Sequence, residues 1–241
     1  MGRADPHCHT HASDGMVGPA ELVAAARELK LDLIAVTDHD TMACVAETVA
    51  LGEAVGLAVV AGQEVTTAWP AQTHVVGWFL ERPVRMGMSL AETVAAIHEQ
   101  GGLAVIPHPF MPTWFASCQE GMLARLIETQ SVDAVEIEHT APTTAGRRAA
   151  LHAFYQAHRE RLGAAVAGSD SHFGRHDLGR AITEFAGSSA EDFRKAVLAH
   201  TTRPVTGVRE AHVPLALVAR QQARSLVELP LRRLRGQLQQ H

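Results

Sequence analysis

Several features that would place this chain in a special class of proteins are missing from its sequence. No apolar run reaches the roughly 18 residues that a membrane-spanning helix needs, so no membrane partner is expected. The first five residues lack the apolar segment of a secretory signal peptide. The three cysteines, Cys8, Cys44 and Cys118, lie far apart and are odd in number, which argues against a disulfide framework. A cytoplasmic location is therefore expected.

Lysine is nearly absent as well, with two residues against 19 arginines, and the formal net charge is −5. Residues 209–241 carry six arginines and two glutamates, a net +4, which leaves −9 for residues 1–208. Binding of long nucleic acid through phosphate neutralisation is not favoured for such an acidic body. Histidine is abundant, with 15 residues, and imidazole is the commonest metal ligand in proteins.

Hydrophobic residues make up 46% of the 241 residues, enough for one domain with a substantial core. Strand-length apolar runs are expected to form strands at residues 31–37, 57–61, 74–79, 103–106, 133–137, 164–167 and 181–185. Helical patterns lie between and after them at residues 19–29, 43–55, 89–101, 119–129, 144–162 and 190–200. Repeated strand–helix units predict a parallel sheet covered on both faces, and their number favours a closed barrel. An open doubly wound sheet is the alternative.

Residues 209–241 are expected to form a C-terminal helical extension of a domain at residues 1–208. Pro214 and Pro230 bracket one helix, and Leu231, Leu234 and Leu238 continue an apolar stripe after it. We expect this segment to pack on the barrel or on a second subunit, which would give a homo-oligomer through the C-terminal helices. A basic amphipathic contact with a membrane or nucleic acid is a weaker alternative.

Polar residues gather where the predicted strands end. Histidine, aspartate and glutamate fall in residues 5–9, 37–40, 62–64, 106–109 and 168–172. The carboxyl ends of parallel strands build the active site of α/β folds, so these segments are expected to meet at one mouth. His74 departs from the pattern, because it begins its apolar run instead of ending one.

The spacing within these segments suits metal binding. Residues i and i+2 of extended backbone share a face, so His7 and His9 can reach one ion together, and so can Asp170 and His172. A mixed set of imidazoles and carboxylates suits Mn²⁺, Zn²⁺ or Fe²⁺ and needs no thiolate. Divalent ions of these kinds are expected, in preference to Mg²⁺.

The order and wording of these segments resemble the PHP (polymerase and histidinol phosphatase) superfamily of metal-dependent phosphoesterases. The resemblance runs through DPHCHT at 5–10, SDG at 13–15, VTDHDT at 36–41, GQEV at 62–65, HVVG at 74–77, 101–109 and GSDSH at 168–172. It implies a distorted (β/α)7 barrel, TIM-barrel-like, with up to three metal ions. Pro6 stands where leucine is usual, and proline removes a ladder donor, so the first strand is expected to start late.

The resemblance also implies a ligand set. The first ion would take His7, His9, Glu64 and Asp170. The second would take Glu64 as a bridge, with His74 and His108, and the third Asp14, His39 and His172. Beside these ligands, Asp5, Asp38 and Asp40 are expected to orient imidazoles through their second nitrogen.

Phosphate is expected to gain a cation from Arg175 or Arg180, which follow the last motif. His176 or a metal-bound water is expected to protonate the leaving group, and the sequence does not choose between them. His11 and His139 also fall near the mouth, with open roles.

The resulting hypothesis is hydrolysis of a small phosphate monoester, such as a nucleotide, sugar or amino-alcohol phosphate, by a metal-activated hydroxide. Phosphate or sulfate is expected to occupy the same site. Two alternatives stay open: 3′–5′ exonuclease-type cleavage of nucleic acid, and a metal-binding regulatory domain without turnover.

Overall fold

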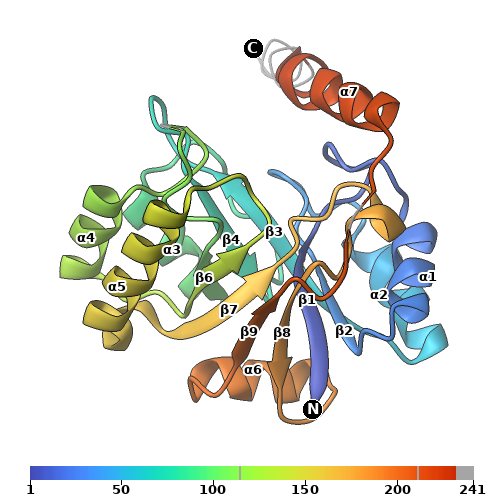
Figure 1. The fold of residues 1–241 in the computed structure, drawn as a ribbon, viewed down its shortest axis with the longest axis horizontal. Coiled ribbons are helices and arrows are strands. Elements are labelled where there is room, and N and C mark those ends of the chain that lie inside the picture. The colour runs from blue at the N-terminus through green and yellow to red at the C-terminus, as the bar shows by residue number, and fades with distance from the viewer. Residues whose placement is uncertain (114, 211, 232–241) are drawn as a thin grey trace.

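The computed structural model describes residues 1–113, 115–210 and 212–231 of the chain. Its sheet is built from nine strands: β1 Gly2–Cys8, β2 Leu33–Val36, β3 Ala58–Thr66, β4 His74–Trp78, β5 Leu103–Ile106, β6 Ala134–His139, β7 Ala164–Gly168, β8 Ala181–Phe185 and β9 Arg203–Thr206. The order across the sheet is β7-β6-β5-β4-β3-β2-β1-β8-β9. The sheet curls into a nearly closed barrel, so the predicted TIM-barrel-like α/β fold is confirmed (Figure 1).

Helices surround this barrel (Figure 1). They are α1 Pro19–Glu28, α2 Val45–Val55, α3 Leu90–His98, α4 Glu120–Thr129, α5 Ala145–Leu162, α6 Ala190–Leu198 and α7 Leu215–Ala223. Six of them form where the sequence pattern predicted. Helix α3 begins at the expected capping box, in which Ser89 Oγ accepts from the Glu92 amide and the Glu92 side chain accepts from the Ser89 amide.

The prediction of a purely parallel sheet is wrong. Strand β4 is antiparallel to β3 and β5, and β8 is antiparallel to β1 and β9. Only residues 67–73 join β3 to β4, and so short a connection cannot make the crossover that parallel neighbours need. Strand β9, with half of its four residues exposed, was not predicted.

The expectation that the first strand starts late is also wrong, because β1 begins at Gly2. Pro6 is accommodated at an irregularity, where the pairing of β1 with β2 shifts register between Asp5 and Cys8. The Pro6 carbonyl accepts a 2.9 Å hydrogen bond from the indole Nε1 of Trp78 on β4. The strand therefore forms although Pro6 has no amide hydrogen to donate to the neighbouring strand.

Side-chain hydroxyls join β7, at one edge of the sheet, to β8, which lies next to the other edge strand, β9. Thr183 Oγ1 on β8 accepts from the Ala167 amide of β7 at 2.9 Å and donates to the Ala167 carbonyl at 2.8 Å. Ser169 Oγ likewise accepts from the Ala181 amide at 3.0 Å and donates to the Ala181 carbonyl at 3.1 Å. These bonds take the place of a main-chain ladder, and they satisfy buried peptide groups that would otherwise lack partners.

Aromatic side chains fill the lower end of the barrel. Phe193 of α6 packs against Trp78 and Phe185, with ring centroids 5.2 and 5.3 Å apart, and all three side chains are fully buried. Helix α6 thus covers the end at which β1 starts (Figure 1). The opposite end, where β1, β2 and β3 finish, carries a pocket that His39 and His74 line.

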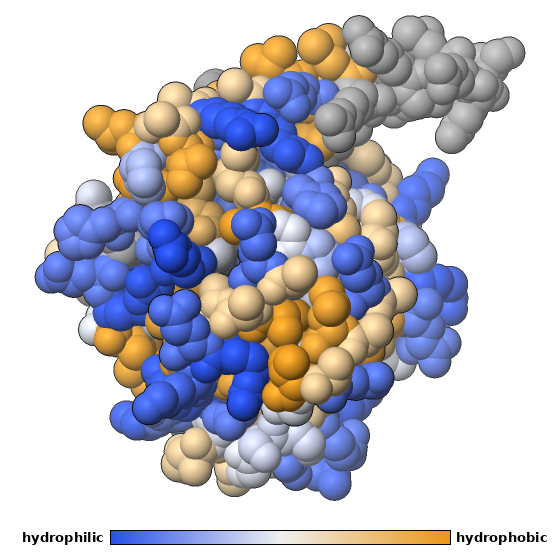
Figure 2. Space-filling model, turned by 90° about the vertical axis from the view of Figure 1, so that its right-hand side faces the viewer, coloured by the Kyte–Doolittle hydropathy of each residue, from blue (hydrophilic) through white to orange (hydrophobic). Residues whose placement is uncertain are grey.

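The predicted C-terminal helix forms between Pro214 and Pro230: α7 continues into a π-helical turn over Arg224–Glu228. It lies above the open end of the barrel (Figure 1). Leu226 and Val227 are exposed, and apolar side chains show at the top of the face seen from the side of α1 and α2 (Figure 2). The leucines at 234 and 238 lie outside the described residues, and the homo-oligomer stays a prediction.

None of the helices in the described ranges is both long and apolar enough to cross a membrane.

Candidate metal centre

The open end of the barrel holds all nine predicted metal ligands in one cluster. Each lies on a strand or in the loop that adjoins one: His7, His9 and Asp14 on and after β1, His39 after β2, Glu64 on β3, His74 at the start of β4, His108 after β5, and Asp170 and His172 after β7. His74 belongs here although it begins its strand, because β4 runs antiparallel to β3. The first residue of β4 therefore lies at the same end as the last residues of β1 and β2.

The first ligand group matches the set implied by the resemblance. Donor atoms of His7, His9, Glu64 and Asp170 all lie within 4.8 Å of one another. His9 Nε2 is 3.2 Å from Glu64 Oε2 and 3.0 Å from Asp170 Oδ1, and His7 Nε2 is 3.3 and 3.4 Å from the same oxygens. Four donors at this spacing around one point can surround a single ion.

Two further groups share ligands with the first. His39, Glu64 and His74 form one, in which His74 Nδ1 is 2.9 Å from Glu64 Oε1. His108 Nε2 lies 3.1 Å from that oxygen, on the side where the resemblance places it.

The third group joins Asp14, His39 and His172, as implied, and adds His9. Asp14 Oδ1 is 3.2 Å from His172 Nε2 and 3.8 Å from His39 Nε2. His9, His39 and Glu64 thus each belong to two groups.

Unpaired buried atoms show that this cluster fits metal ions. Asp14 Oδ1, Glu64 Oε2, Asp170 Oδ1 and His74 Nδ1 are all buried, and none has a hydrogen-bond partner among the described residues. The imidazole nitrogens approach these oxygens closely but not in hydrogen-bond geometry. Buried polar atoms without partners are costly, and cations among them would satisfy their lone pairs.

The protonation equilibria also favour a cation. Burial alone would raise the pKa of Asp170, but the charges of His7 and His172 outweigh it and hold that pKa well below its usual range. Burial lowers the pKa of His39 to about 3, which keeps its imidazole neutral and able to ligate. Asp170 therefore stays ionised inside the barrel, and a divalent cation could take the place of the protons on the imidazoles of His7 and His172.

Glu136 on β6 contacts two of the predicted ligands, and the sequence analysis missed it. Its Oε1 is 2.9 Å from His7 Nδ1, and its Oε2 accepts from the His108 amide at 2.9 Å. It therefore fixes the ring of one ligand and the main chain of another. The signal in the sequence was a charged residue in the middle of an apolar strand pattern. In the structure this residue, Glu136, is 1% exposed.

Asp5, Asp38 and Asp40 were expected to orient imidazoles. Among the contacts described, only Asp38 reaches an imidazole, and it does so through another side chain. Asp38 accepts from the amide and hydroxyl of both Thr10 and Ser13, and Ser13 Oγ lies 3.4 Å from His9 Nδ1. Asp38 therefore clamps the loop that carries Asp14 and reaches His9 through Ser13.

The other two aspartates, Asp40 and Asp5, accept hydrogen bonds from neighbouring strands and loops. Asp40 accepts from the amide and hydroxyl of Thr66, which follows Glu64 on β3. Asp5 accepts from the amides of Ser169 and Gly179, and burial raises its pKa to about 7.

The structure separates the predicted phosphate and proton-transfer residues. Arg175 and His176 lie in a 3₁₀ turn, Gly174–His176, and line a pocket against α1 that none of the nine ligands lines. His176 Nδ1 is 3.1 Å from the His212 carbonyl oxygen. Arg180, in contrast, lines a pocket next to the main chain that carries Asp170.

The C-terminal segment reaches the metal centre. Gln221 of α7 is buried, and its Nε2 donates to Asp14 Oδ2 at 2.9 Å. Arg224 donates to the carbonyls of His11 and Ser13 in the same loop. No motif pointed to these contacts, because they join positions more than 200 residues apart.

This segment also forms one wall of a pocket at the mouth. Leu226, Leu229 and Pro230 face His39 and His74 across a cavity of 520 Å³. Phe115 lines its rim. The cavity has room for a small molecule, with metal ligands on one wall and apolar side chains on the other.

Metal-dependent phosphoesterase of the PHP type is the class of protein that this barrel and its ligand cluster define. The family model for the PHP domain matches residues 5–228, nearly the whole chain. The chain therefore belongs to the PHP domain family. The match also extends past residue 208, where the sequence analysis placed the end of the main domain.

Individual relatives match this chain over shorter stretches than the family model does. The chain is 31% identical over 102 residues to a 5′-3′ exoribonuclease of Haemophilus influenzae, covering 42% of this chain and 37% of that protein. It is 36% identical over 78 residues to a 3′,5′-nucleoside bisphosphate phosphatase of Chromobacterium violaceum, covering 32% and 27%. The chain thus spans about a third of these two proteins.

Among solved structures, a two-domain protein of Bacteroides vulgatus containing a predicted PHP-like metal-dependent phosphoesterase superposes with a TM-score of 0.70. The two chains are 17% identical, and the match covers 92% of this chain and 69% of that one. At this identity the likeness shows a shared fold.

Proposed function

We propose that this protein hydrolyses the phosphate monoester of a small molecule at a trinuclear metal site. The observation that carries the proposal is the overlap of three ligand groups, which share His9, His39 and Glu64 and leave buried oxygens without partners. The donor set of imidazoles and carboxylates suits Mn²⁺, Zn²⁺ or Fe²⁺. When bound, such ions supply a water of lowered pKa and neutralise the charge on phosphate oxygens.

The chain's own residues build the environment for this chemistry. Glu64 presents one oxygen to His74 and His108 and the other to His7, His9 and His39, so it could hold two ions at once. Glu136 holds His7 and the His108 main chain in place. Asp38 and Gln221 hold the loop that carries Asp14 and the Asp14 side chain itself. A site fixed from several sides needs little rearrangement during turnover.

A small substrate is favoured by the size of the mouth. The C-terminal segment walls the 520 Å³ cavity beside His39 and His74, which suits a nucleotide-sized molecule. The relative named a 3′,5′-nucleoside bisphosphate phosphatase supports a nucleotide. The acidic body disfavours long nucleic acid.

Cleavage of phosphodiesters in RNA is the second candidate, because another relative is named a 5′-3′ exoribonuclease. That name gives a 5′–3′ direction, opposite to the 3′–5′ cleavage that the sequence analysis kept as an alternative.

The test is a panel of phosphomonoesters and a 5′-labelled oligoribonucleotide, assayed with Mn²⁺ and with elemental analysis of the same preparation. Release of phosphate from monoesters, lost in Glu64→Gln, is expected. Shortening of the oligonucleotide without monoester hydrolysis would favour the second candidate. Metal bound at the site without turnover of either would overturn both and leave a regulatory metal-binding domain.

A further inference from the structure

A buried imidazole at the open end of the barrel lies outside the three ligand groups. His139 is the last residue of β6 and is 4% exposed. Its Nδ1 is buried and has no hydrogen-bond partner among the described residues. A buried polar atom without a partner costs free energy, so a polar ligand that reaches this ring would be favoured.

An irregularity in β6 turns this ring into the barrel. The pairing of β6 with β7 shifts register between Glu136 and Glu138. Glu136 points inward, onto His7, whereas Glu138 lies against Arg148 of α5, outside the sheet. Side chains alternate between the two faces of a strand, so the residue after Glu138 returns to the inner face. Bulges shift register in this way and occur at the rims of barrels, where they re-aim a side chain.

The neighbouring strand gives the same direction for the ring. His139 is paired with Gly168 on β7. A Cβ atom on Gly168 would lie 2.7 Å from the His7 Cβ and 2.6 Å from Glu136 Oε1, so that face of β7 looks into the barrel. Paired residues on neighbouring strands share a face of the sheet. His139 therefore faces the interior at the level of Gly168, two residues before the ligand Asp170.

The charges around His139 keep its ring neutral. Burial lowers the pKa of His139 to about 4, and the charge of Glu136 opposes this only in part. The ligands His108 and Asp170 are near enough for their charges to act on the ring as well. A metal cation beside the ring would lower its pKa further. At neutral pH the imidazole therefore carries one N–H donor and one acceptor nitrogen.

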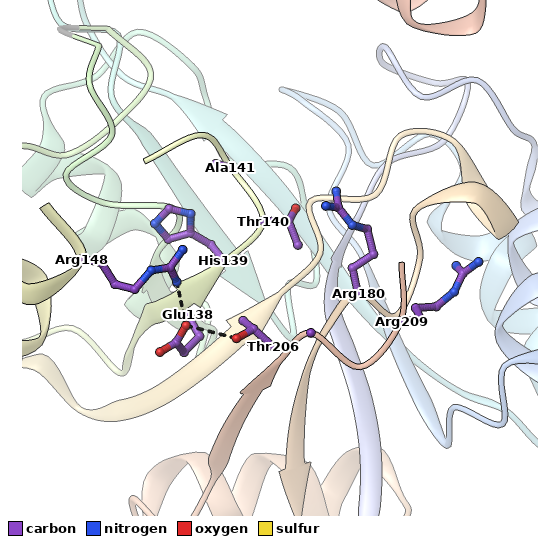
Figure 3. Close-up of a pocket in the computed structure, with 9 residues that line it drawn as sticks. Glu138, His139, Thr140, Ala141, Arg148, Arg180, Thr206 and Arg209 are labelled. Carbon is purple, nitrogen blue, oxygen red and sulfur yellow. Dashed lines mark hydrogen bonds and ion pairs between the residues drawn. The ribbon is translucent and has the colours of Figure 1, made fainter. Parts of the chain in front are cut away.

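A small molecule can reach this ring. His139 lines a cavity of 460 Å³ at the end of β6. In Figure 3, Glu138 is joined to Arg148, and the His139 ring lies above them, toward the open end of the barrel. Thr140 Oγ1 donates to the Ser169 carbonyl at 2.7 Å, which fixes His139 beside the main chain that leads to the first ligand group. The ring thus borders the cavity on one side and the barrel interior on the other.

We propose that His139 binds the phosphate of the substrate, and that its neutral imidazole donates an N–H to a phosphate oxygen at the metal centre. The inference rests on the proposed function, because it requires phosphate to lie between the ions and this ring. A donor without charge adds to the binding of phosphate and does not repel the cations beside it. The same hydrogen bond gives the buried ring a partner.

The test is calorimetric titration of the Mn²⁺-loaded protein with inorganic phosphate. His139→Ala should weaken phosphate binding by about tenfold to a hundredfold, the scale of a hydrogen bond to an ionised group. His139→Asn and His139→Gln carry an amide N–H near the places of Nδ1 and Nε2, and one of them should recover part of the affinity. Elemental analysis should find the same Mn²⁺ content in every variant. His200→Asn, in the exposed turn after α6, is the matched control.

Equal phosphate affinity in His139→Ala and the wild type, or no binding to the wild type, would overturn the inference. Losses of the same size in all three His139 variants would do so as well, because the ring would then act through packing alone. A lower Mn²⁺ content would make His139 a metal ligand instead.

The outcomes separate this inference from the proposed function. Phosphate binding that depends on His139, in a protein that turns over no phosphomonoester, would support the anion site while the proposed function fails. Turnover of a phosphomonoester with unchanged KM and unchanged phosphate affinity in His139→Ala would refute the role of His139 and leave the proposed function standing.

Discussion

Gln221 and Asp14 are joined by a 2.9 Å hydrogen bond across 207 positions of the chain. Through it, the C-terminal helix orients a ligand of the third metal group. The oxygen that Gln221 contacts is Oδ2, which leaves Oδ1 facing His172 and His39. The C-terminal segment therefore contacts the candidate metal centre directly.

Gln221→Ala should weaken binding of the most loosely held ion by about tenfold, because partners that orient metal ligands contribute on this scale. Competition with a chromophoric chelator measures it. Arg220→Ala, exposed on the same helix, is the control and should bind metal as the wild type does. Unchanged affinity in Gln221→Ala would mean that the hydrogen bond serves only to dock the helix.

Glu136→Gln should weaken metal binding at the first group by about tenfold to a hundredfold. The change keeps the shape of the side chain but removes the charge that faces His7 Nδ1, and it lets the amide compete for the wrong tautomer of the ring. Chelator competition gives the affinity, and a melting curve with and without Mn²⁺ gives its contribution to stability. Glu128→Gln, exposed on α4, is the matched control, and equal values for both variants would contradict the assignment.

Thr183→Val should lower the free energy of unfolding by about 2 kcal/mol, because it leaves the buried amide and carbonyl of Ala167 without partners. The valine has nearly the same shape, so the loss reports the hydrogen bonds at the closure of the barrel. Urea denaturation measures it. Thr129→Val at the exposed end of α4 should change stability by less than about 0.5 kcal/mol. A similar small effect at Thr183 would show that closure does not depend on the hydroxyl.

The pair of His98 and Asp133 should give a pH-dependent contribution to stability. The hydrogen bond to Asp133 raises the pKa of His98, with Nε2 2.8 Å from Oδ2. The folded state therefore binds the proton more tightly than the unfolded chain, and the stabilisation is complete below the unfolded pKa. It is lost as pH rises through the raised folded pKa.

His98→Ala should accordingly cost up to about 1 kcal/mol at pH 5.5, a small value because the pair is partly exposed, and less at pH 8.5. Urea denaturation of both proteins at the two pH values measures the difference. His200→Ala, in the exposed turn after α6, provides the control. A cost that is the same at both pH values would show that the ring contributes by packing alone.

The parts of the site that lay in short motifs were predictable. His7 and His9 stand two apart on extended backbone, so the sequence alone places both rings on one side of β1. Asp170 and Glu64 follow buried apolar runs, whose length identifies them as strands. The fold class followed from the same alternation of strand and helix patterns.

Direction and distant pairing were not predictable. Residues 74–79 have the same apolar pattern whichever way the strand runs, so His74 seemed misplaced until the reversal of β4 explained it. Nothing in the local sequence indicates which distant residues lie next to Glu136, Arg180 or Gln221. Arg175 and Arg180 are close in sequence, yet one lines a pocket against α1 and the other a pocket beside Asp170.

The sequence by itself determined which residues can bind metal and that their segments end strands, because side-chain chemistry and backbone periodicity are local properties. Only the tertiary structure decided which candidate ligands lie together, which acid contacts His7 and His108, and which arginine lies beside the Asp170 main chain. Those relations depend on how the sheet curls and on where α7 lies, and both are set by packing between residues far apart in the chain.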